Sequence, residues 1–187
     1  MELPHSFSFL MPNSQFRGVP VPIVYQCRVF SVEESRLRFP NGAEHDVCVV
    51  RHPPSVVIIP MKDRDHVILI RQYRPAIARE IWELPAGSMD QGETAEAAAA
   101  RECEEEIGLV PQRVERLRGL FPAPGFCDEE LIFCRASDLR PPASDSPHRP
   151  DEDEYIQPTV FTVAEAKAMA ARGDIIDLKS AFGLTLI

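Results

Sequence analysis

Residues 82–109 read WELPAGSMDQGETAEAAAARECEEEIGL, and eight of these twenty-eight side chains are acidic. Thr94 is a suitable N-cap, a run of four alanines favours a helix, and Gly108 is a suitable C-terminal stop. The pattern therefore predicts a helix over residues 94–107. Acidic side chains crowded onto one helix repel one another, so the fold has to compensate this repulsion.

The predicted helix has a narrow apolar stripe that can face a sheet. Its members are Ala95, Ala99, Cys103 and Ile107. At about 100° per residue, Glu102, Glu105 and Glu106 fall together on one flank of the stripe, and Glu104 falls on the other. Three such carboxylates repel strongly unless a multivalent cation lies among them, and all-oxygen ligation suits Mg²⁺ or Mn²⁺. The alternative is a solvated acidic face that binds nothing.

Seven residues in this segment match, without a gap, the pattern G-x5-E-x7-R-E-U-x-E-E-x-G-U, where U is a bulky apolar residue. They are Gly87, Glu93, Arg101, Glu102, Glu105, Glu106 and Gly108, with Cys103 and Leu109 at the two U positions. Cys is a slightly small residue for its position. The pattern is the signature of Nudix hydrolases, which this chain resembles. Agreement by chance is very unlikely at seven fixed positions, so the match favours a metal site over a solvated face.

The resemblance implies an α+β fold, the Nudix α/β/α sandwich with a mixed central sheet, preceded here by a small N-terminal antiparallel β segment. It also implies that Glu102 and Glu106 are the principal metal ligands, with Glu105 as an auxiliary ligand and the carbonyl of Ala86 completing the shell. Arg101 and Glu105 join the catalytic group, and Arg101 braces the loop against the helix through an ion pair with Glu93. Bound Mg²⁺ or Mn²⁺ would then neutralise diphosphate oxygens and activate water.

Three features outside the signature resemble the ADP-ribose pyrophosphatase branch. They are RQYR at 71–74 leading to WELPAG, the loop PAPGFCDEE at 122–130, and an N-terminal β segment. The resemblance implies that a glutamate in the loop is the general base. Family position favours Glu129 over the alternative Glu130, because Glu130 begins the apolar run ELIFC, which is expected to be a strand.

The same resemblance gives a set of candidate substrate-binding residues, which are Arg51, Arg74, Glu83, Phe30 and Phe126. Arg74 is a natural phosphate ligand, although it could instead pair with a surface carboxylate. Arg51 is expected near the ribose or base, and Phe30, or else Tyr25, is expected to stack on adenine unless these rings are core residues. Glu83 is expected to orient substrate or water.

The length of the chain predicts one domain with an appendage. We expect an N-terminal β segment over 1–54 and a Nudix domain over 55–187. The resemblance implies that the N-terminal segment serves dimerisation and base binding. Asn41-Gly42 indicates a hairpin between strands 25–38 and 44–51. Further strands are expected over 55–61, 66–73, 79–84, 114–121 and 130–137, and a second helix over 162–174. The Pro-rich, acidic stretch 141–155 predicts a long loop, in which Glu152 or Glu154 could supply a late metal ligand or proton acceptor.

Composition excludes several classes of protein. A net charge of −9 and a pI near 5.1 argue against nucleic-acid binding. No apolar run is long enough for a membrane span, no signal peptide is visible, and five cysteines without a CxxC pair favour a reducing cytoplasm. Composition favours a cytoplasmic protein, and the resemblance implies a homodimeric enzyme that hydrolyses the nucleotide sugar ADP-ribose to AMP and ribose 5-phosphate with Mg²⁺. The alternatives are a hydrolase of other nucleoside diphosphate sugars and a non-catalytic nucleotide sensor.

Overall fold

The computed structural model describes residues 22–146 and 156–187. The strands of these ranges are β1 (Ile23–Gln26), β2 (Ser31–Arg38), β3 (Glu44–Arg51), β4 (Ser55–Pro60), β5 (His66–Arg74), β6 (Arg79–Glu83), β7 (Ala86–Ser88), β8 (Val110–Leu120), β9 (Leu131–Arg140) and β10 (Ile156–Thr162). The helices are α1 (Ala95–Ile107), α2 (Val163–Arg172) and α3 (Leu178–Gly183), with 3-10 turns η1 (Pro75–Ile77) and η2 (Leu184–Leu186).

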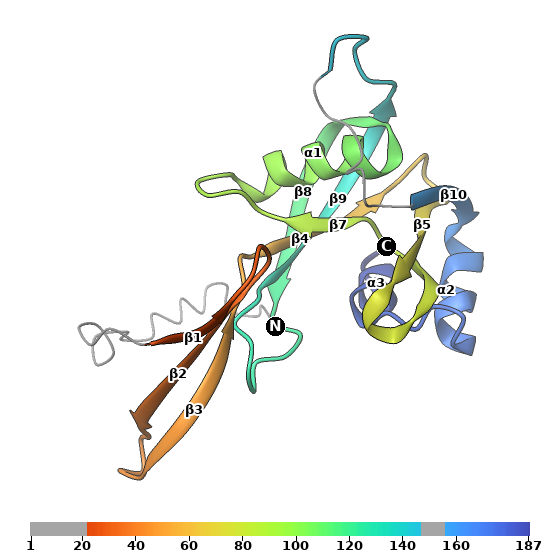
Figure 1. Ribbon diagram of the computed structural model, residues 1–187. Coiled ribbons are helices and arrows are strands. Elements are labelled where there is room, and N and C mark those ends of the chain that lie inside the picture. The colour runs from red at the N-terminus through yellow and green to blue at the C-terminus, as the bar shows by residue number, and fades with distance from the viewer. Residues whose placement is uncertain (1–21, 147–155) are drawn as a thin grey trace, which may run out of the picture.

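The strands form three sheets (Figure 1). The central sheet has the order β7-β4-β9-β8 and is mixed, because β4 runs parallel to β9 while the pairs β4–β7 and β8–β9 are antiparallel. The second sheet, β10-β5-β6, and the N-terminal sheet, β1-β2-β3, are antiparallel throughout. The mixed central sheet that the sequence predicts is therefore confirmed.

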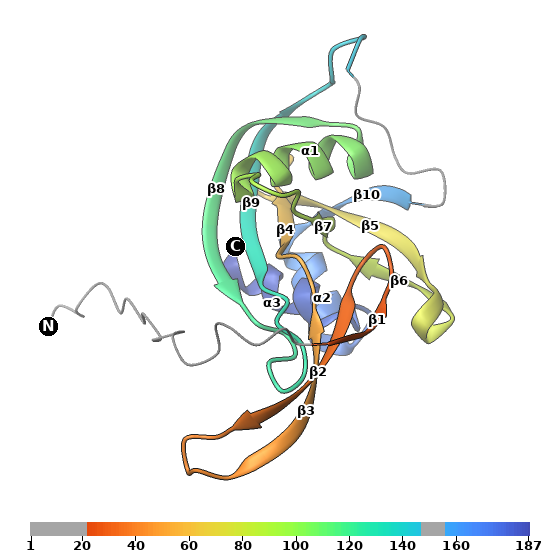
Figure 2. The ribbon, with the colours of Figure 1, turned by 60° about the vertical axis from the view of Figure 1, so that its left-hand side comes forward.

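Strand β4 forms the middle of the core because all six of its residues are buried. Its side chains alternate between two apolar clusters, with Val56 and Ile58 in the cluster under α1 and Val57 and Ile59 in the cluster under α2 and η2. Helix α1 covers one face of the strands, and α2 and α3 cover the other (Figure 2). This layering confirms the predicted α+β sandwich.

Both predicted helices are present, and α1 has the predicted caps. The Thr94 hydroxyl accepts the Ala97 N–H at 3.2 Å, and Gly108 ends α1 with a φ of 68°. Thr162 and Gly173 have the same roles in α2. The predicted apolar stripe of α1 is buried against the sheet, so the acidic flank is turned toward the strands' edge at β7.

The N-terminal region is partly different from its prediction. The Asn41-Gly42 hairpin between β2 and β3 is confirmed, with Gly42 at a φ of 83°. A single strand over 25–38 is wrong, because the Cys27 N–H bonds the Phe30 carbonyl at 3.0 Å and this turn divides the segment into β1 and β2. The resulting sheet projects from the sandwich (Figure 1).

Sequence patterns missed the shortest elements. Strand β7 has three residues, too few for a periodic pattern, and α3 has six residues. The part of the predicted loop over 141–146 contains no helix or strand, while Glu152 and Glu154 lie outside the described residues. None of the helices in the described ranges has the length and apolar composition needed to span a membrane.

Candidate active site

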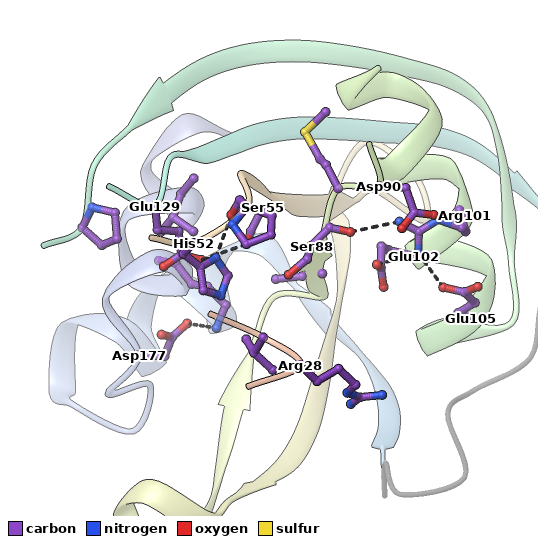
Figure 3. A pocket seen from close by; sticks show the side chains of 18 of the residues that line it. Arg28, His52, Ser55, Ser88, Asp90, Arg101, Glu102, Glu105, Glu129 and Asp177 are labelled. Carbon is purple, nitrogen blue, oxygen red and sulfur yellow. Dashed lines mark hydrogen bonds and ion pairs between the residues drawn. The ribbon is translucent and has the colours of Figure 1, made fainter. Parts of the chain in front are cut away.

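A cleft of about 830 Å³ lies where β7 and α1 meet the connection between β3 and β4, the loop before β9 and the start of α3. Figure 3 shows two groups of labelled side chains on opposite sides of this cleft. Arg101, Glu102 and Glu105 come from α1, and the other group includes His52 and Glu129. We call these the helix end and the loop end of the cleft.

Arg101 organises the helix end. Its guanidinium donates two hydrogen bonds to Glu93, of 3.2 and 3.0 Å, and a third of 3.1 Å to the Ser88 carbonyl. The predicted Arg101–Glu93 ion pair is therefore present. The hydrogen bonds to Glu93 are the main reason that the pKa of Arg101 is raised above its ordinary value. The pair ties the loop after β7 to the helix.

The same guanidinium also pairs with two of the predicted metal ligands. Its Nη1 donates to Glu102 Oε1 at 2.7 Å and to Glu105 Oε2 at 2.9 Å. Within residues 22–146 and 156–187, no group of three His, Cys, Asp or Glu side chains is already gathered closely enough to hold a metal ion. Arg101 therefore balances the charges of Glu102 and Glu105 in this structure.

Local geometry still fits a divalent cation at this end. A Cβ on Gly87 would lie 2.0 Å from the Glu102 carboxyl carbon, so only glycine leaves room for that carboxylate beside β7. Glu106 is buried and accepts the Ala86 N–H at 3.0 Å, which holds its carboxylate against the same strand. Carboxylate and carbonyl oxygens are the ligands that Mg²⁺ and Mn²⁺ prefer.

Cys103, between these glutamates on α1, faces the core. Its side chain is fully buried, and burial followed by the charges of Glu106 and Glu104 raises its pKa to about 12. The thiol is therefore neutral at physiological pH, and its place in the core explains why an apolar residue is expected at this position of the signature.

Glu129 lies at the loop end of the cleft. Its Oε1 accepts the Ser55 hydroxyl at 2.8 Å and lies 3.6 Å from His52 Nδ1. Glu130 does not line the cleft, because its carboxylate lies against Gly119 and 3.9 Å from Arg116 on strand β8. Of the two predicted alternatives for the general base, only Glu129 is in the cleft.

An ion-pair network centred on the buried Glu83 lies at the wall of the cleft. Arg74 Nε and Nη2 donate to the two oxygens of Glu83 at 2.6 and 2.7 Å, and Glu83 is only 1% exposed. Lys179 also bonds Glu83, and it donates to Asp177 at 2.8 Å. The hydrogen bond to Glu83 is the main cause that raises the pKa of Arg74. Arg74 lines the cleft, while Glu83 is behind it.

Three other predicted substrate-binding residues are outside the cleft of the described chain. Arg51 pairs with Glu33 at 2.6 Å and with Asp128 at 3.0 Å, and the bond to Glu33 is the main cause that raises its pKa. Phe30 packs near Tyr25 with ring centroids 5.9 Å apart, and Phe126 is exposed. Their roles with substrate stay predictions.

The cleft also contains polar residues that the sequence did not indicate. They are Arg28, His52, Ser55, Asp177 and Lys179. Ser55 is the first residue of β4, and the others come from a turn, a connection or the start of α3, where no periodic pattern or motif marks them. The Pro53-Pro54 pair lies in the connection between β3 and β4, where the chain passes the cleft.

Comparison with known proteins agrees with this geometry. The chain matches the NUDIX domain family over residues 51–179. An ADP-ribose pyrophosphatase of Bacillus subtilis is 27% identical over 86% of this chain and 86% of its own length. An ADP-ribose pyrophosphatase of Mycobacterium tuberculosis is 32% identical over 89% of this chain and 80% of its own.

A solved structure is similar as well. The crystal structure of an ADP compounds hydrolase covers 90% of this chain and 89% of its own, with a TM-score of 0.76 and 27% identity. The family match covers well over half of the chain and includes the whole of α1 and β7. The chain therefore belongs to the Nudix hydrolase family, in the branch that its ADP-ribose pyrophosphatase relatives represent.

Proposed function

We propose that this protein hydrolyses the diphosphate bond of ADP-ribose with Mg²⁺, giving AMP and ribose 5-phosphate. Nudix hydrolases generally use a divalent cation, and relatives over most of the chain are ADP-ribose pyrophosphatases. The observation that carries the proposal is the cleft itself, which has several carboxylates at one end and a separate carboxylate, that of Glu129, at the other. Its volume of about 830 Å³ suits a ligand of this size.

At the helix end, Glu102, Glu105 and Glu106 would hold the cation, with the Ala86 carbonyl beside them. When bound, the cation neutralises the charge of the diphosphate oxygens and polarises the phosphorus. Arg101 keeps the loop from Gly87 in place through Glu93 and Ser88, so the ligands stay against β7. We assign Arg101 to positioning and charge balance in the absence of substrate.

At the loop end, Glu129 would accept the proton of the attacking water. A carboxylate suits this role when its other contacts hold it in the cleft, and the Ser55 hydroxyl supplies such a contact at 2.8 Å. The water oxygen forms the new bond to phosphorus, the bridging oxygen leaves with one phosphate group, and the proton passes to Glu129. Arg74 lines the cleft between the two ends and is the candidate ligand for the substrate phosphates.

A substrate panel tests the function. Purified protein would be incubated with ADP-ribose, ADP-glucose, GDP-mannose and UDP-glucose, with Mg²⁺, Mn²⁺ or a chelator, and the products separated by chromatography. We expect ADP-ribose to give AMP and ribose 5-phosphate at a kcat/KM at least about tenfold above the other substrates, and no turnover with chelator. Turnover of another substrate without ADP-ribose turnover would contradict the proposal.

A broader hydrolase is the second candidate. The solved structure of an ADP compounds hydrolase covers nearly the whole chain, which favours a site that accepts ADP with several partners. The contacts proposed at the helix end would involve a cation and a diphosphate, so they would not select the sugar. Comparable kcat/KM values for ADP-ribose and ADP-glucose in the same panel would establish this second candidate.

We also propose that the N-terminal segment, residues 1–54, joins two copies of the chain. Sheet β1–β3 projects from the sandwich (Figure 1), and Ile23, Val24 and Tyr25 of its edge strand are 54%, 55% and 56% exposed. An exposed apolar edge strand is a ready surface for another chain. A partner there would also bring Phe30 or Arg51 close to a nucleotide, as the sequence predicts for base binding.

Light scattering tests the dimer. We expect a mass near twice 21.0 kDa for the full chain, and a monomer after Ile23→Lys and Tyr25→Lys together. This double variant keeps the end of β3 intact, which a deletion of residues 1–50 would remove. Val160→Lys changes a residue of β10 that is 41% exposed, and it should stay dimeric. A monomeric full chain with full ADP-ribose activity would overturn the proposal.

A further inference from the structure

The loop that carries Glu129 is attached to the end of the N-terminal sheet. At its last residues, β3 stays paired with β2 on one edge and pairs with the loop on the other. The Val50 N–H donates to the Phe126 carbonyl at 2.8 Å, and the Asp128 N–H donates to the Val50 carbonyl at 3.1 Å. Val50 and Cys127 form a parallel bridge. One strand therefore connects two parts of the molecule that the sequence predicts as separate segments.

Asp128 strengthens this attachment with its side chain. Its Oδ1 accepts the His52 N–H at 2.9 Å, and its Oδ2 accepts Arg51 Nη1 at 3.0 Å. Arg51 is the last residue of β3 and His52 follows it, so one carboxylate binds two consecutive residues at the end of that strand. The other carboxylate on Arg51 is Glu33 of β2, at 2.6 Å, which does not touch the loop.

The next residue after Asp128 is Glu129, so this attachment holds the backbone on one side of Glu129. On its far side the Ser55 N–H donates to the Glu130 carbonyl at 2.9 Å, and Ser55 begins the parallel pairing with β9 at Leu131. Glu129 therefore lies between two backbone anchors, one on β3 and one on β4. The anchor on β4 belongs to the central sheet, but the anchor on β3 depends on Asp128.

We propose that Asp128 is a positioning residue, which fixes the loop to the end of β3 and thereby sets the place of the Glu129 carboxylate in the cleft. This rests on the proposed function, in which Glu129 accepts the proton. Removing Asp128 lets the loop shift without changing any residue that lines the cleft. A shift of about 1 Å at a reacting group lowers rates by as much as 10²-fold, so the effect should appear in kcat.

Steady-state kinetics on the full-length protein test the proposal. We expect Asp128→Ala to lower kcat by about 10- to 10²-fold while KM stays within about twofold. Asp128→Asn keeps an oxygen for the His52 N–H and should lose less. Glu33→Gln is the matched control, because it removes the other carboxylate from Arg51 without touching the loop, and it should keep wild-type kcat.

A double-mutant cycle separates positioning from general destabilisation. If Asp128 acts through Glu129, then Asp128→Ala in a Glu129→Gln background should lower kcat by less than about twofold. An unchanged kcat in Asp128→Ala, a raised KM with constant kcat, or full additivity with Glu129→Gln would each overturn the proposal.

Hydrogen exchange gives a readout that needs no substrate. In Asp128→Ala, the amides of Val50 and Asp128 should exchange at least about tenfold faster, while those of α1 are unchanged. Slow exchange at both amides in this variant would overturn the proposal. If the wild-type protein lacks ADP-ribose turnover, the proposed function fails, while faster exchange at these two amides would still support the attachment of the loop by Asp128.

Discussion

The two ends of the cleft are built in different ways. The helix end comes from one continuous stretch, Ala86 to Glu106, in which the partners of Arg101 and Glu106 lie within about one loop and one helix. The loop end combines His52, Ser55 and Glu129, which are separated by up to 77 residues in the sequence. The first end is a local structure, and the second exists only after the sheets have formed.

This difference has a physical consequence. At the helix end the carboxylates repel one another, and Arg101 offsets that repulsion by pairing with three of them. At the loop end a single carboxylate is held by one hydroxyl and by backbone pairing, so its place depends on packing. Changes at the helix end should therefore alter metal dependence, and changes at the loop end should alter kcat at a fixed metal requirement.

The largest effect is expected for Glu106→Gln. The amide keeps an oxygen for the Ala86 N–H, so the fold should remain, but the loss of one anionic ligand weakens the cation site. We expect nearly all turnover to disappear at moderate Mg²⁺. Glu96→Gln removes an exposed carboxylate from the same helix and should keep activity. Activity of Glu106→Gln within about threefold of wild type, with unaltered metal dependence, would refute the metal assignment.

The next effect concerns the two neighbouring glutamates of the loop. Glu129→Gln should lower kcat by about 10² to 10⁴-fold with little change in KM, because proton removal matters in the transition state. Glu130→Gln should be mild, since Glu130 contacts Arg116 outside the cleft. The Mg²⁺ requirement of both variants should match the wild type. A severe loss of kcat in Glu130→Gln with a mild loss in Glu129→Gln would show that Glu130, and not Glu129, is the general base.

The same contrast explains what the sequence could predict. The signature from Gly87 to Leu109 gave the helix, its caps and the Arg101–Glu93 pair, because these contacts lie within one or two helical turns of each other. The fold class followed from the order of strands and helices. By contrast, His52 and Lys179 have no local signal, and their place in the cleft depends on how β3, β4 and α3 meet.

Arg74 and Glu83 show a further limit of sequence reasoning. Each was expected to meet the substrate, and the structure joins them in a bidentate pair that no periodic pattern predicts. Lys179, which also bonds Glu83, lies 96 residues after Glu83 in the chain. The antiparallel register of β5 with β6 pairs Arg74 with Arg79, four residues from Glu83, so strand pairing alone would not have suggested the contact.

A stability measurement on Glu83→Gln probes this network. The substitution leaves Arg74 and Lys179 beside a neutral amide at a site that is 1% exposed, so we expect a loss of about 3 kcal/mol in the free energy of unfolding. Glu80→Gln breaks the exposed pair with Arg71 on the same hairpin and should change it by less than about 1 kcal/mol. Urea unfolding measures both. Equal small losses would show that the network contributes little.

The smallest effect is expected for Ser55→Ala, which removes the hydroxyl that donates to Glu129 at 2.8 Å. Glu129 keeps its backbone anchors, so its carboxylate should stay in the cleft but be oriented less exactly. One such hydrogen bond contributes about 1 kcal/mol, which corresponds to a fall in kcat of roughly fivefold with KM unchanged. Ser55→Thr restores the hydroxyl, and its kcat should lie closer to that of the wild type. Because Ser55 is 6% exposed, urea unfolding of both variants checks that packing is intact. A wild-type kcat in Ser55→Ala would show that the backbone anchors alone position Glu129.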